Sequence, residues 1–237
     1  MAKTELKLGM AAKKPRKSRK DRIIEVAEKL FAQRGFNGVS LREITREAGV
    51  DVALVKYYFD NKEGLFDALL QRRADILNRE RGEALDRVLA RNNPAPVEDI
   101  IDAFTHPLLN EVVGEDSTWR DYFGLLAQVN NNPEWGGQVM SKYFDPLVRR
   151  FIYALKDALP EADMVDIYWC YHFLSGALTL TFADTRRIDS LSGGLCHSAD
   201  FESVHKRMVP FIAAGFRSIC AERAAERAAT PSTETSS

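Results

Sequence analysis

The stretch that most constrains the fold is residues 40–62, SLREITREAGVDVALVKYYFDNK, which predict two short helices separated by a glycine turn. Ser40 and Glu43 have the spacing of a capping box, which starts the first helix. Gly49 can adopt the left-handed conformation that closes this helix, and Asp51 can cap the next one. The pattern is that of a helix-turn-helix.

A helix-turn-helix cannot bury its own apolar faces, so the flanking segments must cover them. Ser18 and Asp21 form another candidate capping box, and a stripe of apolar residues follows as far as Gly35. Phe36 and Val39 are expected to plug the connection. Asn61 is a candidate cap for a fourth helix that starts at Lys62 and runs to about Ala90. The stripe of the first helix consists of Ile23, Ala27, Leu30 and Phe31.

Residues 22–70 resemble the N-terminal domain of the TetR family of transcriptional regulators. The matching elements are A-x-x-L-F in the first helix, G-F after it, S-x-x-x-I in the second, A-G-V at the turn, Y-Y-F ending the third, and N-K-E starting the fourth. The resemblance implies a DNA-binding head, a C-terminal helical domain that binds a small inducer, and homodimerisation through the last two long helices.

The rest of the chain contains helical patterns and no alternating segment that predicts a strand, so the expected fold is all-α. We expect a basic arm at 1–17, a helix-turn-helix domain at 18–62, a regulatory and dimerisation domain at 63–224, and a disordered tail at 225–237. Helices are expected at 97–113, 117–130, 133–158, 161–183 and 200–224, with a loop at 184–194.

Three residues are expected to disturb these helices: Gly82 as a kink or break, and Pro107 and Pro146 as kinks or interruptions. Asn132 before Pro133 predicts a helix start. The basic arm, which contains KKPRK, could follow the phosphates or a minor groove, or could be an idle solubilising tail.

Composition favours a cytoplasmic protein. Apolar residues make up 45% of the chain, no run suits a membrane span or signal peptide, and the three cysteines lack metal-binding spacing. Residues 1–62 carry a net charge of +7 and residues 63–237 carry −8. A basic N-terminal part suits a phosphate backbone, although such an asymmetry also arises from simple solvation of a surface.

Enzymatic signatures are missing from the sequence, and we expect neither a catalytic centre nor a cofactor nor a metal. The closest metal-like group is Cys196, His197 and Asp200, with His205 beyond it. Ser203 and Lys206 match an S-x-x-K spacing by chance, because the other motifs of those hydrolases are missing.

The candidate DNA-reading residues lie on the second and third helices and at the start of the fourth. Val52 and Ala53 could contact only thymine methyl groups, so Lys56, Arg42 or Arg46 would supply hydrogen bonds to bases. Val52 and Leu54 could instead pack in the core. The full set is Ser40, Arg42, Arg46, Val52, Ala53, Leu54, Lys56, Tyr57 and Lys62.

The family resemblance implies phosphate contacts for Tyr57 and Lys62. For Ser40 it implies a capping hydroxyl or an amide contact at the start of the second helix. A helix N-terminus favours an anion beside Lys62, although a solvated lysine would also fit there. The family more often has Thr or Gly-Thr in this recognition helix, where this chain has Ala53 and Leu54. The base sequence that is read therefore cannot be carried over.

Segment 161–183 is apolar nearly all round and must be covered on every side. With 200–220 it is the expected homodimer interface, which would place two heads on a palindromic DNA operator.

Aromatic residues of the second half could line an apolar effector pocket, although each one singly could be ordinary core. The candidates are Phe104, Trp119, Phe123, Tyr143, Trp169, His172 and Phe173. Residues 171–194 further resemble the fatty-acid or acyl-CoA responsive branch of the family. The phosphates of an acyl-CoA could meet Arg149 and Arg150 or Arg186 and Arg187, or these arginines could be merely solvated.

These features together predict a repressor that binds its operator as a homodimer and is released by a small apolar effector, with fatty acid and acyl-CoA as candidates. The alternatives are a DNA-binding activator or architectural protein without small-molecule control, and a regulator with an effector of aromatic or drug type.

Overall fold

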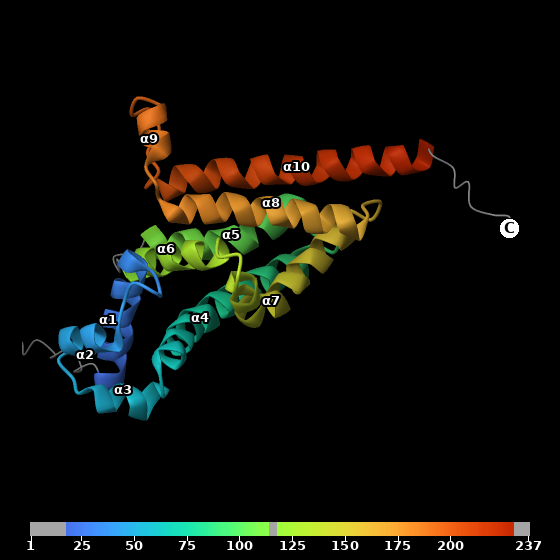
Figure 1. The fold of residues 1–237 in the computed structure, drawn as a ribbon. Helices are drawn as coiled ribbons and strands as arrows, with labels where there is room; N and C mark the ends of the chain where they lie inside the picture. The colour runs from blue at the N-terminus through green and yellow to red at the C-terminus, as the bar shows by residue number, and fades with distance from the viewer. Residues whose placement is uncertain (1–17, 114–117, 230–237) are drawn as a thin grey trace, which may run out of the picture.

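The computed structural model describes residues 18–113 and 118–229, which form ten helices and no strand (Figure 1). The all-α prediction is confirmed. The arm at 1–17 lies outside the described residues. The helices are α1 (Arg19–Arg34), α2 (Leu41–Ala48), α3 (Val52–Phe59), α4 (Lys62–Arg91), α5 (Val97–Val113), α6 (Thr118–Asn130), α7 (Gly136–Ala158), α8 (Met164–Ala183), α9 (Arg187–Leu191) and α10 (Phe201–Ala229).

Helices α1 to α3 form the head, and each begins as its capping residues predict. The Ser18 and Ser40 hydroxyls accept from the amides three residues later, and the Glu43 carboxylate returns a bond to the Ser40 amide. Gly49 ends α2 at φ 61° and ψ 44°, the left-handed conformation that a side chain would disfavour. Asp51 accepts from the Ala53 amide and so caps α3.

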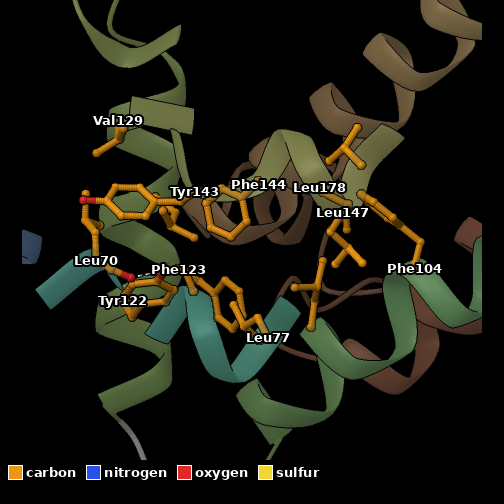
Figure 2. Close-up of a cluster of buried hydrophobic side chains, with 14 of the residues drawn as sticks. Leu70, Leu77, Phe104, Tyr122, Phe123, Val129, Tyr143, Phe144, Leu147 and Leu178 are labelled. Carbon is orange, nitrogen blue, oxygen red and sulfur yellow. Dashed lines mark hydrogen bonds between the residues drawn. The ribbon is translucent and has the colours of Figure 1, made fainter. Parts of the chain in front are cut away.

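Helices α4 to α10 form the body. The long α4 leaves the head and packs against α5 and α7, while α8 and α10 lie side by side at the far edge (Figure 1). Figure 2 shows apolar side chains of several helices meeting between α4 and α8, among them Leu77, Phe104, Phe123 and Phe144.

Side-chain contacts fasten the head to the body besides the chain itself, and two of them involve hydrogen bonds to α1. The Gln128 amide on α6 donates to the Ala32 carbonyl of α1 at 2.8 Å. Arg73 on α4 binds the buried Glu28 carboxylate of α1 at 2.9 Å. Burial raises the pKa of Glu28, although hydrogen bonds from Arg73 act in the opposite direction. Helix α1 therefore rests on both α4 and α6.

Several element boundaries differ from the predictions. Helix α7 begins at Gly136, because the Asn132 side chain accepts from the Glu134 and Trp135 amides and closes a turn there. Asp163 caps α8 and sets its start at Met164. The short α9 lies inside the expected loop at 184–194, and α10 continues to Ala229, past the expected start of the tail at 225.

The expected interruptions at glycine and proline do not occur. Gly82 is buried within an unbroken α4, where Leu147 and Arg150 of α7 approach it closely. Pro107 and Pro146 lie inside α5 and α7, and neither interrupts its helix. Over the described part of the chain, every helix is too short or too polar to span a membrane.

Candidate DNA-reading head and effector cavity

Helix α3 has one buried face and one free face. Val55 and Phe59 are buried in the head, while Tyr57 is 80% exposed and Val52 is 43% exposed. Leu54 is half-buried against the core, which favours packing over base contact for this residue. Ala53 and Lys56 are exposed beside Val52.

The remaining predicted DNA-contacting residues surround α3. Arg42 and Arg46 are exposed on α2, and Ser40 is exposed at its N-terminus. Arg34 of α1 pairs with Glu43 at 3.0 Å. Hydrogen bonds from the Ser40 amide and hydroxyl, with that from Arg34, lower the pKa of Glu43 to about 2.

Lys62 stands at the start of α4, where the resemblance implies a phosphate contact, but its side chain is half-buried. The ammonium lies 4.3 Å from the centre of the Phe36 ring and 5.9 Å from that of Phe31. A cation above an aromatic face is stabilised without an anion. To reach a phosphate, this side chain would have to exchange or share that contact.

Sequence reasoning missed Arg22, which lies on α1 and reaches the turn of the helix-turn-helix. Its guanidinium donates to the carbonyl oxygens of Ala48 and Gly49, the latter at 3.3 Å. Those carbonyls end α2, where a positive charge is favoured by the helix dipole. Arg22 therefore fixes the turn between α2 and α3. Its 26-residue separation from Ala48 leaves no local motif from which the contact could have been found.

A cavity of about 70 Å³ lies in the body, between α4, α5, α6, α7 and α8. Its wall is mainly apolar and aromatic. Phe123 and Phe182, both in this wall, stack directly on each other with ring centres 4.3 Å apart. The lining residues are Arg81, Phe104, Leu108, Phe123, Leu126, Ala127, Asn130, Met140, Phe144, Val148, Tyr171, Ser175, Leu178, Thr179 and Phe182.

Of the predicted pocket residues, Phe104 and Phe123 line this cavity. Trp119 is buried one turn before Phe123, with the Arg73 guanidinium 4.3 Å from its ring centre. Tyr143 donates its hydroxyl proton to the Asp67 carboxylate and lines a separate groove near the head with Phe36. Trp119 and Tyr143 therefore do not belong to the cavity wall.

The other predicted pocket residues, Trp169, His172 and Phe173, do not line this cavity. All three are exposed on the outer face of α8, with Trp169 at 56% and Phe173 at 52%. The sequence could not separate the two faces of α8, because its apolar residues run nearly all round. Tyr171 and Leu178, on the opposite face, line the cavity instead.

Arg81 is the cavity residue that the sequence did not reveal, because it is one of many arginines on α4. It is only 3% exposed, and its guanidinium carbon lies 3.7 Å from the centre of the Phe104 ring. Its Nε and Nη2 atoms have no hydrogen-bond partner among the described residues. Burial lowers the pKa of Arg81 to about 10, so that it still carries a positive charge at neutral pH.

The arginines proposed for acyl-CoA phosphates lie away from the cavity. Arg150 pairs with Asp86 and Arg149 with Asp145, both on the surface. Arg186 and Arg187 are exposed at the start of α9.

The metal-like group of the sequence does not come together as a site. Asp200 accepts from the Ser203 amide at the start of α10, and His205 turns instead toward Asp102 of α5, at 2.9 Å. His106 lies beside them, with its ring centre 4.9 Å from that of His205. Asp102, His106 and His205 are each exposed or partly exposed.

Two family models match the chain. The model of bacterial regulatory proteins of the TetR family matches residues 23–69, and the model of the tetracycline repressor-like C-terminal domain matches residues 102–215. The first covers the head and the start of α4. The second covers most of the body, including α8 and the first half of α10.

Curated relatives match only part of the chain. The Bacillus subtilis helix-turn-helix regulator YttP is 53% identical over 53 residues, which are 22% of this chain and 26% of that protein. IcaR of Staphylococcus aureus, described as a negative transcriptional regulator of the biofilm operon icaADBC, is 32% identical over 115 residues, 48% of this chain and 55% of IcaR. The matches thus span from about a quarter to about half of these relatives' lengths.

The fold resembles a crystal structure of a TetR-like transcriptional regulator from Rhodococcus sp. RHA1, with a TM-score of 0.60 at 18% identity. That match covers 86% of this chain and 97% of the Rhodococcus chain. Members of the family are DNA-binding regulators rather than enzymes, and they typically form dimers. With matching models over both its head and its body, this chain belongs to the TetR family of transcriptional regulators.

Proposed function

We propose that the protein is a homodimeric repressor that binds a DNA operator through its two heads and is released by a small effector entering the cavity of the body. The observation that carries the proposal is that α6, a helix of the body, both lines the cavity and contacts the head. Its Phe123, Leu126 and Asn130 line the cavity, and its Gln128 binds the head at Ala32. A cytoplasmic location follows from binding to the chromosome.

The exposed residues of the head support DNA binding. Lys56 and Tyr57 are free on α3, and Arg42 and Arg46 flank them on α2. In a helix-turn-helix, the N-terminal part of the second helix reaches base edges in the major groove, while flanking cations hold phosphates. Val52 and Ala53 add only apolar contacts, so we expect DNA shape and the spacing of the two heads to contribute to specificity.

The outer face of α8 and α10 supports homodimerisation. It exposes Val165, Trp169, Phe173 and Leu180 on α8 and Phe211, which is 75% exposed, on α10. An apolar patch of this kind on a helix pair is typical of a protein interface. These residues belong to the two segments, 161–183 and 200–220, that the sequence suggests as the interface. Leu191 at the end of α9 and Leu195 in the loop that follows are also exposed apolar side chains.

The small size of the cavity supports a mechanism in which the effector enlarges the cavity and thereby releases the DNA. Ligand pockets usually enclose about 300–1,000 Å³, several times the 70 Å³ present here. An effector must therefore push lining side chains and helices apart. Movement of α6 would be passed to α1 through Gln128 and Ala32, and would change the spacing of the two heads. IcaR, which is described as a negative transcriptional regulator, supports repression.

The proposal is tested with the purified full-length chain and DNA from upstream of its own gene. Light scattering after size exclusion measures the oligomeric state, and fluorescence anisotropy measures binding to this DNA and to a shuffled sequence of equal composition. Thermal shift against fatty acids, acyl-CoAs and aromatic compounds selects binders, which are then tested for DNA release.

We expect a dimer that prefers its own upstream DNA and loses affinity when a binder is added. Binders that raise the melting temperature without releasing DNA would contradict small-molecule control and would favour the architectural or activator alternative. If aromatic compounds shift the protein and acyl compounds do not, the expected fatty-acid or acyl-CoA branch is wrong.

A further inference from the structure

We infer that the cavity binds the carboxylate of an organic acid through Arg81, and that the effector is therefore a free monocarboxylic acid. This inference rests on the proposed function, since it names the chemical class of the effector. It starts from a charge in the wall of an otherwise apolar cavity.

Arg81 lacks the partner that a buried charge requires. Its Nε and Nη2 atoms are unpaired among the described residues, and no acidic side chain belongs to the described wall of the cavity. Burying a charge without a counter-charge is costly, and the Phe104 ring at 3.7 Å offsets only part of that cost. The missing partner is an anion with at least two acceptor atoms.

The geometry of the free donors selects a carboxylate. Nε and one Nη of a guanidinium form a fork that matches two oxygens of one planar group, as in arginine–carboxylate pairs. Within the protein, Arg73 shows this arrangement, because its Nε and Nη2 donate to the two oxygens of Glu28 at 3.2 and 2.9 Å. In Arg81, which belongs to the cavity wall, the same two atoms are buried and have no hydrogen-bond partner among the described residues.

The remaining wall accounts for an apolar body of the acid. Phe123, Phe144 and Leu178 provide apolar surface next to Arg81. Beyond them, the Asn130 amide donates to the Thr179 hydroxyl at 2.6 Å. Both residues also line a groove of about 380 Å³ on the side of α8, so the chain of a longer acid has a route outward between α6 and α8.

The same geometry disfavours a thioester as the group at Arg81. A thioester carbonyl is uncharged and cannot offset the guanidinium. The inference therefore separates free acids from their coenzyme A thioesters, both of which the sequence left open. It leaves alkyl and aromatic acids as two sources of the same carboxylate.

The test measures binding of octanoate, phenylpropanoate, octanol and octanoyl-CoA to the full-length protein by isothermal titration calorimetry. Arg81→Met removes the charge while keeping an apolar chain of similar length, and Arg81→Lys keeps the charge without the fork. Arg79→Met, at an exposed position of the same helix, is the matched control. Circular dichroism checks that each variant is folded.

We expect one or both free acids to bind at least about 10-fold more tightly than octanol or the thioester. Arg81→Met should lose that preference, Arg81→Lys should retain part of it, and Arg79→Met should keep all of it. Equal affinity of acid and alcohol in the unmodified protein, or an unchanged preference for the acid in folded Arg81→Met, would overturn the inference.

Anisotropy with upstream DNA, run in parallel, separates this inference from the proposed function. If an acid binds through Arg81 but does not release DNA, the inference stands and the proposed control fails. If octanol releases DNA as well as octanoate does, also from Arg81→Met, the control stands and the inference fails.

Discussion

In the head, Arg22 donates to the last carbonyls of α2 and Arg34 pairs with Glu43, so that the charged groups around the helix-turn-helix complete its caps. In the body, Arg81 is buried with two nitrogens unpaired, beside a cavity too small for a typical ligand. These charged groups of the head are therefore paired within the head, and its DNA-binding surface is exposed. In the body, by contrast, buried nitrogens of Arg81 have no hydrogen-bond partner among the described residues, and apolar side chains along α8 and α10 are exposed.

The largest expected effect concerns the outer face of the body. Changing both Phe173 and Phe211 to Glu should weaken the dimer at least about 100-fold, because large apolar residues at the centre of an interface cost most when lost. Sedimentation equilibrium measures the change. The control is Tyr153→Glu, since this tyrosine is 58% exposed on α7, outside the two helices of the proposed interface. Equal weakening by the control would remove the argument for the interface.

A smaller effect is expected from the cap of the head. Arg22→Met should lower the free energy of unfolding by about 1 kcal/mol, because the C-terminal carbonyls of α2 lose a cation. Urea unfolding measures it, with Arg42→Met as the control, since Arg42 is exposed on α2. A variant as stable as the original would show that the turn is fixed without Arg22.

The contact between head and body gives the next prediction. Gln128→Ala removes the hydrogen bond from α6 to Ala32, and should reduce about 3-fold to 10-fold the factor by which octanoate weakens DNA binding. DNA affinity without octanoate should change little. Gln138→Ala, at an exposed position of α7, is the control and should leave the factor unchanged. An unchanged factor in Gln128→Ala would show that this hydrogen bond does not transmit the change.

Much of the head could be predicted from the sequence, because its caps are local. Ser40 with Glu43, Gly49 and Asp51 each act on a group no more than four residues away, and each is placed as expected. Contacts between distant residues could not be predicted. Arg22 meets the end of α2, and Gln128 meets α1 across 96 residues.

The body shows a second limit. The composition of α8 indicated that it is covered on all sides, but could not tell which aromatic residues face the cavity and which face outward. Trp169 and Phe173 lie outward, while Tyr171 lies inward. The orientation is set by packing against α6 and α10, which is a property of the whole fold.

The next prediction concerns the phosphate contact proposed for Lys62 in the DNA-binding surface. Lys62→Met keeps an apolar side chain against Phe36 but removes the charge. Affinity should fall similarly for specific and shuffled DNA, and the slope of log affinity against log salt should decrease by about 1, as for one lost phosphate contact. Anisotropy over a salt series measures this slope. An unchanged slope would refute the phosphate contact.

The smallest effect is the contribution of Glu43 in acid. Its pKa is lowered to about 2 in the folded protein from an ordinary value of 4.5. Its stabilising effect is therefore complete above pH 4.5 and disappears as the pH falls toward 2. Urea unfolding over this range should show a shallower loss of stability for Glu43→Gln than for the unmodified protein. Parallel curves would contradict the role of this carboxylate.

The central claim is that the cavity and the head are coupled through the body. It is tested most directly by measuring the dissociation constant of octanoate with and without saturating upstream DNA. Coupling must be reciprocal, so DNA should weaken octanoate binding by the same factor by which octanoate weakens DNA binding. If octanoate binds equally tightly with and without DNA, the two regions are not coupled.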